Sequence, residues 1–321
     1  MILAGDIGGT KCNLALYETR SGRLHRIAQR RFVSRDYPGI EEIVREFIRE
    51  TGGAISAAGF CAAGPVVGNT VCVTNLSWVV DGASLGRVLG LERVVLLNDL
   101  EATGSGIGAL DSSELFPLNP GTRARSANQA VIAPGTGLGI AILFWDGSRH
   151  IVSATEGGHA DFSPRTDEEI ELLRFLKERE GQVSVEVILS GRGFRSVHEF
   201  LDANVRHASF DAPEADPAPE ITRKALAGEC PVCVKTLAMW VEMLGAEAGN
   251  LALRTLARGG VYVAGGIAIK ILEKLKDGTF VRAFCDKSQH RDLLAQIPIH
   301  VVLNEDAPLL GAAVRAAAQV S

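Results

Sequence analysis

Short apolar runs and helix-spaced apolar positions alternate along the chain. Apolar runs that end in polar or glycine-rich residues predict buried strands within the segments 2–4, 54–67, 71–78, 93–100, 129–145 and 261–264. In the segment 39–50 apolar residues repeat at helical spacing and acidic residues stand near the start, which predicts a helix. Longer helical patterns cover 231–258 and 307–320. Strands that alternate with helices predict an α/β fold.

One layout occurs twice. The segments 2–17 and 131–145 each contain an apolar strand, a glycine-rich turn and a second apolar strand, which predicts duplicated lobes whose two turns face one cleft. Between them the stretch 111–128 is polar and rich in Ser, Pro and Gly, as is typical of a boundary. We expect a small α/β domain over 1–109 and a large one over 110–305, with the C-terminal helix 306–321 packing back on the small domain.

Length and charge exclude several classes of protein. A chain of 321 residues can bury a sizeable core in two lobes. Its 33 basic and 38 acidic residues give a net charge of −5, whereas a general nucleic-acid or anionic-membrane surface needs a basic field. Apolar runs stay shorter than the roughly 18 residues of a membrane span, and nothing after Met1 resembles a signal peptide. We expect neither nucleic acid nor membrane as a partner.

The six cysteines are scattered, mostly within apolar runs, which predicts free buried thiols in a reducing cytoplasm. Cys230 and Cys233 have the C-x-x-C spacing of redox and zinc sites. No second pair and no nearby histidine accompanies them, and Pro231 begins a predicted helix. We therefore expect no structural zinc.

Both glycine-rich turns join two strands rather than a strand and a helix. Neither therefore fits the Walker A loop or the dinucleotide-binding turn, since each of these leads into a helix. A hairpin turn can still direct backbone N–H groups at phosphate oxygens, because the missing Cβ atoms permit a close approach. Thr10 and Thr136 add hydroxyl donors, and Asp6 beside phosphates would need a cation between them, which makes it a candidate Mg²⁺ ligand. Two ordinary hairpin turns are the alternative.

Several polar residues have both a structural and a chemical interpretation. Asn98 and Asp99 end an apolar run, where turn chemistry alone favours Asn and Asp. His159 could cap a turn or a helix, and Glu186 could lie on an exposed helix face. Glu156 and His159 flank two glycines, which permit a tight loop that brings both side chains to one point.

An ordered set of motifs narrows these alternatives: G-D-I-G-G-T at 5–10, T-N-L-S-W at 74–78, L-N-D at 97–99, P-G-T-G-L-G at 134–139, E-G-G-H-A-D-F at 156–162, V-S-V-E-V-I-L-S-G-R-G at 183–193 and V-A-G-G-I at 263–267. From residue 3 to about 315 the chain resembles the bacterial ATP-dependent glucokinases of the hexokinase, Hsp70 and actin superfamily. The related ROK sugar kinases usually carry a cysteine-rich zinc site after the equivalent of His159, whereas residues 161–164 here contain no cysteine.

This resemblance implies a two-lobed actin-like ATPase (ribonuclease H-like) fold, with a duplicated βββαβα core and a cleft between the lobes. It implies that Asp99 is the catalytic base, accepting the proton of the sugar 6-hydroxyl. The sugar-binding residues that it implies are Asn75, Asn98, Asp99, Glu156, His159 and Glu186. The ATP-binding residues are Gly5, Asp6, Ile7, Gly8, Gly9, Thr10, Gly135, Thr136, Gly137, Gly265 and Gly266, with Asp6 holding Mg²⁺ directly or through water.

The expected function is therefore ATP-dependent phosphorylation of glucose to glucose 6-phosphate at the entry to glycolysis, by a cytoplasmic homodimer. Two alternatives stay open: a kinase of this fold for another hexose, such as mannose or an amino sugar, and a non-catalytic, sugar-sensing actin-like protein. Fold alone does not separate them, since this architecture hosts many functions.

Overall fold

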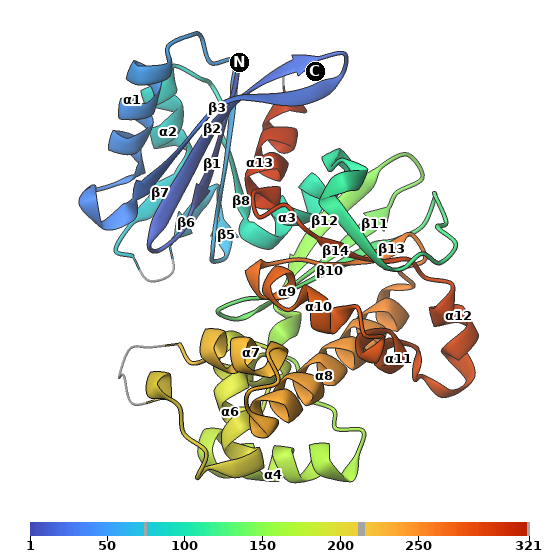
Figure 1. Ribbon diagram of the computed structural model, residues 1–321. Coiled ribbons are helices and arrows are strands. Elements are labelled where there is room, and N and C mark those ends of the chain that lie inside the picture. Colours follow the sequence, from blue (N-terminus) through green and yellow to red (C-terminus); the bar gives the residue numbers. More distant parts are fainter. Residues whose placement is uncertain (74–75, 211–215, 320–321) are drawn as a thin grey trace. The chain divides into compact units, whose positions relative to one another are not determined.

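A computed structural model describes residues 1–73, 76–210 and 216–319 (Figure 1). The chain forms two compact units, Met1–Glu114 together with Asn304–Ser321, and Leu115–Leu303. Both units combine a β-sheet with helices, so the predicted α/β class is confirmed. None of the helices in the described ranges is long and apolar enough to cross a bilayer.

The first unit is built on a five-stranded sheet in the order β3-β2-β1-β4-β8. Its strands are β1 (Ile2–Ile7), β2 (Lys11–Arg20), β3 (Arg23–Val33), β4 (Ala57–Ala62) and β8 (Val95–Asn98). β1, β2 and β3 form an antiparallel meander, whereas β1, β4 and β8 are parallel. The carboxyl ends of the three parallel strands therefore meet at one edge of the sheet.

Helices cover both faces of this sheet (Figure 1). α1 (Ile40–Thr51) and α2 (Gly82–Leu89) pack on the face that carries Leu3. α3 (Asp99–Gly106) and α13 (Ala307–Ala317) pack on the face that carries Ile2 and Ala4. A Cβ atom at Gly311 would collide with the carbonyl oxygen of Ala102, so glycine lets α13 approach α3 closely.

The small elements of the first unit are a three-stranded sheet and three 3₁₀ turns. The sheet joins β5 (Val66–Val67), β6 (Thr70–Cys72) and β7 (Val79–Asp81). The turns are η1 (Ser34–Asp36), η2 (Ile107–Ala109) and η3 (Ser112–Glu114).

The second unit repeats this strand order in a six-stranded sheet, β12-β11-β10-β13-β14-β9. Its strands are β9 (Leu115–Asn119), β10 (Gln129–Pro134), β11 (Leu138–Trp145), β12 (His150–Thr155), β13 (Gly260–Val263) and β14 (Ile299–Val302). β10, β11 and β12 form an antiparallel meander and β10, β13 and β14 are parallel, as in the first unit, and β9 is added at the edge. The duplication predicted from the two glycine turns is present in this topology.

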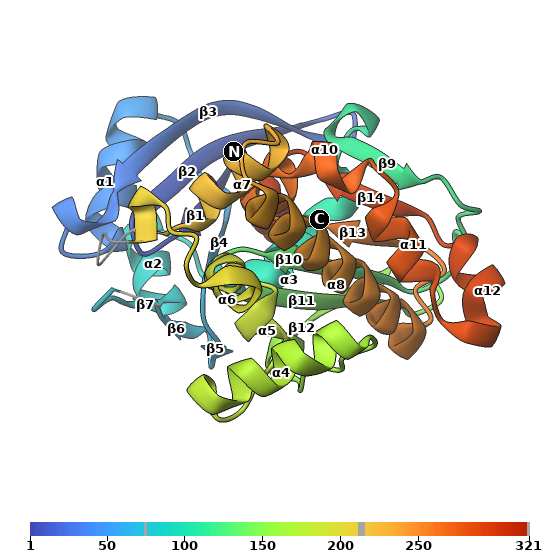
Figure 2. The ribbon, with the colours of Figure 1, turned by 60° about the horizontal axis from the view of Figure 1, so that its bottom comes forward.

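A long helix, α8 (Pro231–Thr255), organises the helical part of the second unit (Figure 2). It packs against α6 (Gly191–Asp202), α7 (Ala218–Leu226) and α11 (Thr279–Cys285). On α8 the buried Trp240 stacks on Phe194, with ring centroids 4.4 Å apart, and donates a hydrogen bond to the carbonyl oxygen of Ile188 at 2.8 Å. The other helices are α4 (Asp167–Glu180), α5 (Val185–Ile188), α9 (Gly266–Lys270), α10 (Leu272–Leu275) and α12 (Arg291–Ala295), with 3₁₀ turns η4 (Gly157–His159), η5 (Ala208–Phe210) and η6 (Ser288–His290).

Candidate active site

The first glycine turn closes the β1–β2 hairpin. The N–H of Gly8 donates to the carbonyl oxygen of Lys11 at 3.0 Å, and a Cβ atom at Gly8 would lie 2.9 Å from that oxygen. Ser34 supports the turn: its N–H donates to the carbonyl oxygen of Thr10 at 3.0 Å and its hydroxyl donates to that of Gly8 at 2.8 Å. The turn is thus held in place before any ligand binds, and Thr10 stays exposed.

Two residues of the predicted phosphate-binding segment face the core. A Cβ atom at Gly5 would collide with the ring of Phe60, and the Ile7 side chain is buried. Packing inside the sheet explains why a glycine stands at position 5. Gly5 and Ile7 can therefore contact a ligand only through their backbones.

Asp6 lies at the end of β1, where the sheet register sets its neighbours. It is opposite Asn13 on β2 and Cys61 on β4, and the Cys61 thiol donates to its Oδ1 at 3.6 Å. Burial raises the pKa of Asp6, hydrogen bonds from Cys61 and Asn13 oppose the rise, and the carboxylate of Asp306 adds to it. Sequence analysis missed both Cys61 and Asp306.

Asn98 and Asp99 mark the transition from β8 to α3. Asn98 caps the helix: its Oδ1 accepts from the Leu100 N–H at 2.9 Å, and its Nδ2 donates to the carbonyl oxygen of Gly64 at 3.1 Å. Oδ1 of Asp99 accepts from the same Leu100 N–H at 2.9 Å. Burial raises the pKa of Asp99 to about 6, the Leu100 N–H opposes this, and the charge of Asp6 raises the pKa further. A carboxylate with this pKa suits general-base chemistry near neutral pH.

The acidic residues at this edge of the first unit repel one another. Besides the effect of Asp6 on Asp99, burial and then both carboxylates raise the pKa of the Cys61 thiol well above its usual value. A divalent cation would offset that repulsion, and carboxylate oxygens are ligands that Mg²⁺ prefers. The residues present therefore fit the predicted Mg²⁺ ligand at Asp6.

The second glycine turn lies between β10 and β11, and the carboxylate of Glu186 packs against it. The N–H of Gly135 donates to the carbonyl oxygen of Gly137 at 2.8 Å. Oε2 of Glu186, on α5, accepts from the N–H of Leu138 at 2.9 Å, and a Cβ atom at Gly137 would collide with this carboxylate. Glycine at 137 therefore allows Glu186 to pack directly on the turn.

Glu156, His159 and Glu186 come together in the second unit, as the sequence predicts for the first two. Nδ1 of His159 is 3.6 Å from Oε2 of Glu156, and its Nε2 is 3.8 Å from Oε1 of Glu186. The Glu156 and His159 side chains are 80% and 63% exposed, whereas Glu186 is 19% exposed. Arg192, which sequence analysis missed, places Nη2 4.0 Å from Oε1 of Glu186. Carboxylate acceptors next to an exposed imidazole suit the binding of sugar hydroxyls.

Gly265 is the N-cap residue of α9 and Gly266 is its first residue, close to the second glycine turn. Gly265 has φ of 88°, in the region that favours glycine, and a Cβ atom there would lie 2.8 Å from the carbonyl oxygen of Pro134. Pro134 ends β10 directly before Gly135. The segments 135–137 and 265–266 are therefore neighbours.

The predicted residues fall into one group in each unit. Residues 5–10, Asn98 and Asp99 belong to the first unit, whereas Glu156, His159, Glu186 and the glycines of 135–137 and 265–266 belong to the second. Asn75 lies outside the described residues.

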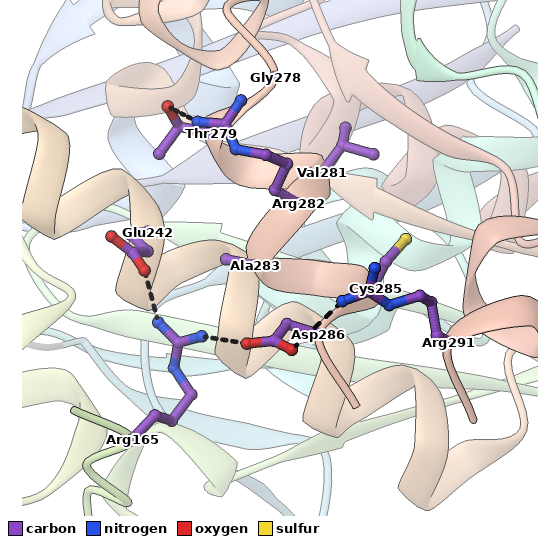
Figure 3. A pocket seen from close by; sticks show the side chains of 10 residues that line it. All are labelled: Arg165, Glu242, Gly278, Thr279, Val281, Arg282, Ala283, Cys285, Asp286 and Arg291. Atoms are coloured by element: carbon purple, nitrogen blue, oxygen red, sulfur yellow. Dashed lines mark hydrogen bonds and ion pairs between the residues drawn. The ribbon is translucent and has the colours of Figure 1, made fainter. Parts of the chain in front are cut away.

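A cavity of about 640 Å³ in the second unit lies apart from these residues (Figure 3). Arg165 places its guanidinium 3.2 Å from Glu242 and 3.8 Å from Asp286, and Arg291 lies 3.8 Å from Asp286. None of the predicted site residues is among the residues that line it. Four of its charged side chains, Arg165, Glu242, Asp286 and Arg291, form these ion pairs, and we assign the cavity no part in the candidate site.

Comparison with known proteins identifies the family. The glucokinase family model matches residues 3–319. The glucokinase of Trichormus variabilis is 38% identical over 340 residues, which cover 99% of this chain and 99% of that protein. The crystal structure of a glucokinase from an Antarctic psychrotroph is similar with a TM-score of 0.88 at 29% identity, covering 99% of this chain and 98% of that one.

A more distant structure shows the same fold. The ROK family glucokinase from Streptomyces griseus, solved with glucose and AMPPNP, has a TM-score of 0.67 at 21% identity and covers 99% of both chains. The predicted two-lobed actin-like ATPase fold and the predicted sugar-kinase class of enzyme are confirmed by these matches. Since the family model and the relative both span nearly the whole chain, the protein belongs to the glucokinase family.

Proposed function

We propose that this glucokinase-family enzyme transfers the γ-phosphoryl group of ATP to the 6-hydroxyl of glucose, with Asp99 as the base. The observation that carries the proposal concerns the Asp99 carboxylate: its burial raises its pKa to about 6. Such a carboxylate is ionised at neutral pH and is a stronger base than an exposed one. The Streptomyces griseus relative, solved with glucose and AMPPNP, supports glucose and an adenine nucleotide as the substrate pair.

In this proposal Asp99 accepts the proton of the 6-hydroxyl as that oxygen attacks the γ-phosphorus and ADP leaves. Phosphoryl transfer has a loose transition state, so positioning and charge stabilisation contribute more than proton removal. Asn98 orients the hydroxyl beside Asp99. Glu156, His159 and Glu186, together with Asn75, bind the ring hydroxyls, and an analogue that lacks one of these hydroxyls would leave a polar group unpaired.

The nucleotide part of the proposal rests on the two glycine turns. Backbone N–H groups of 8–10 and 135–137, with the hydroxyls of Thr10 and Thr136, bind the phosphates, and Gly265–Gly266 lets adenosine lie against the backbone. Asp6 would hold Mg²⁺, directly or through water, and the bound ion would offset the phosphate charge. The resemblance to glucokinases extends the proposal to a cytoplasmic homodimer.

A kinase assay of Asp99→Asn tests the base. We expect kcat to fall by ~10² to 10⁴-fold while glucose binding, measured by calorimetry, is kept. Glu101→Gln is the matched control, because it removes a half-buried carboxylate from the same helix. Near wild-type kcat in a folded Asp99→Asn protein would exclude Asp99 as the base.

A second assay tests the sugar. The wild-type enzyme is compared on glucose, mannose, fructose and N-acetylglucosamine with ATP and Mg²⁺. The proposal requires the highest kcat/KM for glucose. A higher value for mannose or the amino sugar would select the alternative hexose kinase, and no turnover of any of these sugars would contradict the proposal.

A further inference from the structure

Two histidines and two cysteines meet in the helical part of the second unit. His198 lies on α6 and His207 lies just before η5, whereas Cys230 is the N-cap residue of α8 and Cys233 is in its first turn. One ligand atom from each of the four lies within 4.8 Å of the others. The sequence interpretation found no histidine near the C-x-x-C pair. In the folded chain two histidines, distant in sequence, lie next to the two cysteines.

We propose that His198, His207, Cys230 and Cys233 bind one Zn²⁺ ion in a closed structural site. Two thiolates and two imidazoles are a common ligand set for structural zinc. With Zn–S of about 2.3 Å and Zn–N of about 2.0 Å, tetrahedral ligand atoms lie ~3.3 to 3.8 Å apart. Nε2 of His207 is 3.1 Å from Sγ of Cys233, so shifts of well under an ångström would be needed for this pair.

His198 gives independent support, because its polar atoms lack partners. Its side chain is 0% exposed, and within the described part of the chain neither ring nitrogen has a hydrogen-bond partner. Its ring packs edge-on against those of His207 and Phe210, with centroids 5.2 and 5.0 Å away. A buried imidazole without a partner is costly, and a metal bond at one nitrogen would satisfy it.

The charges also favour zinc over a free pair of thiols. Binding of Zn²⁺ displaces the proton of each thiol and forms two Zn–S bonds, and the two imidazoles bind as neutral ligands. The ion and two thiolates sum to zero charge, which suits a buried site, and the N-terminus of α8 favours thiolates.

This site differs from the active-site residues and from the segment after His159. A zinc ion bound there would hold α6, the segment just before η5 and the first turn of α8 together. Four protein ligands occupy all the coordination positions of a tetrahedral zinc ion, so no position is left for a substrate. The role of the zinc is therefore structural rather than catalytic.

Metal analysis of the purified full-length protein tests the proposal. Protein from zinc-supplemented culture is passed through gel filtration, and its zinc is measured by plasma mass spectrometry. We expect about one zinc ion per chain, a more than tenfold loss of zinc in Cys233→Ser and His207→Gln, and full zinc in Cys285→Ser, a free cysteine outside the cluster. A strong chelator should lower the melting temperature of wild type and Cys285→Ser alike.

Cobalt gives a readout that does not depend on the variants folding. Apo wild-type protein reconstituted with Co²⁺ should show the intense visible bands of tetrahedral cobalt and a thiolate-to-cobalt charge-transfer band. Wild-type protein that retains no zinc and gives no such spectrum would overturn the proposal, even if the variants fail to fold. A Cys230–Cys233 disulfide in freshly purified, metal-free protein would overturn it in favour of a redox pair.

Discussion

Replacement of Asp99 by Asn should stabilise the folded protein at neutral pH, although it removes the proposed base. Burial raises the pKa of this carboxyl from 3.8 to about 6 in the folded state, so the folded state binds the proton more tightly than the unfolded chain. Asn has the same shape and keeps an oxygen that can accept from the Leu100 N–H, now 2.9 Å from Oδ1 of Asp99. The substitution therefore removes mainly the cost of a buried charge.

The size and the pH window of this gain follow from the two pKa values. Each pKa unit corresponds to ~1.4 kcal/mol, so the ionised Asp99 costs the folded state at most about 3 kcal/mol. Well below pH 3.8 the carboxyl is protonated in both states and the cost is absent. It grows as the pH rises from 3.8 towards about 6, and it is constant above that. The variant should therefore gain ~1 to 3 kcal/mol above about pH 6.5 and no more than about 0.5 kcal/mol near pH 4.

Urea unfolding of wild type and Asp99→Asn, followed by circular dichroism between about pH 4 and about pH 8, measures this difference. Asp146→Asn is a control of opposite sign. Hydrogen bonds from the backbone of Arg149 and Ser148 and from the Ser148 hydroxyl lower the pKa of Asp146 to about 2, so its charge stabilises the fold. That variant should be less stable than wild type by nearly the same amount over this whole pH range, because the deficit is lost only as the pH falls from 3.8 towards about 2.

A result against the reasoning would be easy to recognise. If Asp99→Asn is less stable than wild type at every pH, its hydrogen bonds matter more than its burial. If it is more stable by the same amount at about pH 4 and about pH 8, the gain does not come from the charge.

Two further predictions concern the kinetics. Glu186→Gln should raise KM for glucose about tenfold with little change in KM for ATP. The substitution weakens a charge-assisted hydrogen bond to the sugar by ~1 to 2 kcal/mol, whereas the Gln side chain can still accept from the Leu138 N–H. Glu171→Gln, which loses only an exposed ion pair with Arg174, is the control, and equal increases in both KM values would contradict a sugar-binding role. The acidic limb of kcat/KM should have an apparent pKa of about 6, and in Asp6→Asn it should move to lower pH, because the Asp6 charge raises the pKa of Asp99. An unmoved limb in Asp6→Asn would show that another group controls it.

Local patterns were sufficient to predict much of the fold. The helix predicted over 39–50 is α1, Ile40–Thr51, because Ile40, Ile43, Val44 and Phe47 are all buried on one face. The duplicated strand–turn–strand segments correspond to β1–β2 and β10–β11, and each is followed by parallel strands in the same order. These predictions succeeded because each depends on residues close together in the sequence.

The neighbours of Asp6, the candidate Mg²⁺ ligand, could not be predicted in the same way. Cys61 reaches Asp6 only because β4 pairs with β1 across 55 residues. Asp306 acts on Asp6 from the segment that leads into α13, near the other end of the chain. No local sequence pattern predicts either contact. Asp306 does lie between a strand and a helix, as Asp99 does, and that shared position could have marked it as a candidate site residue.

The glycines are difficult to interpret for a different reason: a glycine can be required by packing or by ligand binding. Gly5, Gly8, Gly137 and Gly265 each have a neighbour that a Cβ atom would meet, respectively a ring, a backbone carbonyl, a carboxylate and a second carbonyl. Packing alone therefore accounts for these four glycines, whether or not phosphate binds. The assignment of a site rests instead on side chains that packing does not require, above all the partly buried carboxylate of Asp99, whose pKa is raised to about 6. A residue that destabilises its own fold needs another explanation, and chemistry on a bound sugar supplies one.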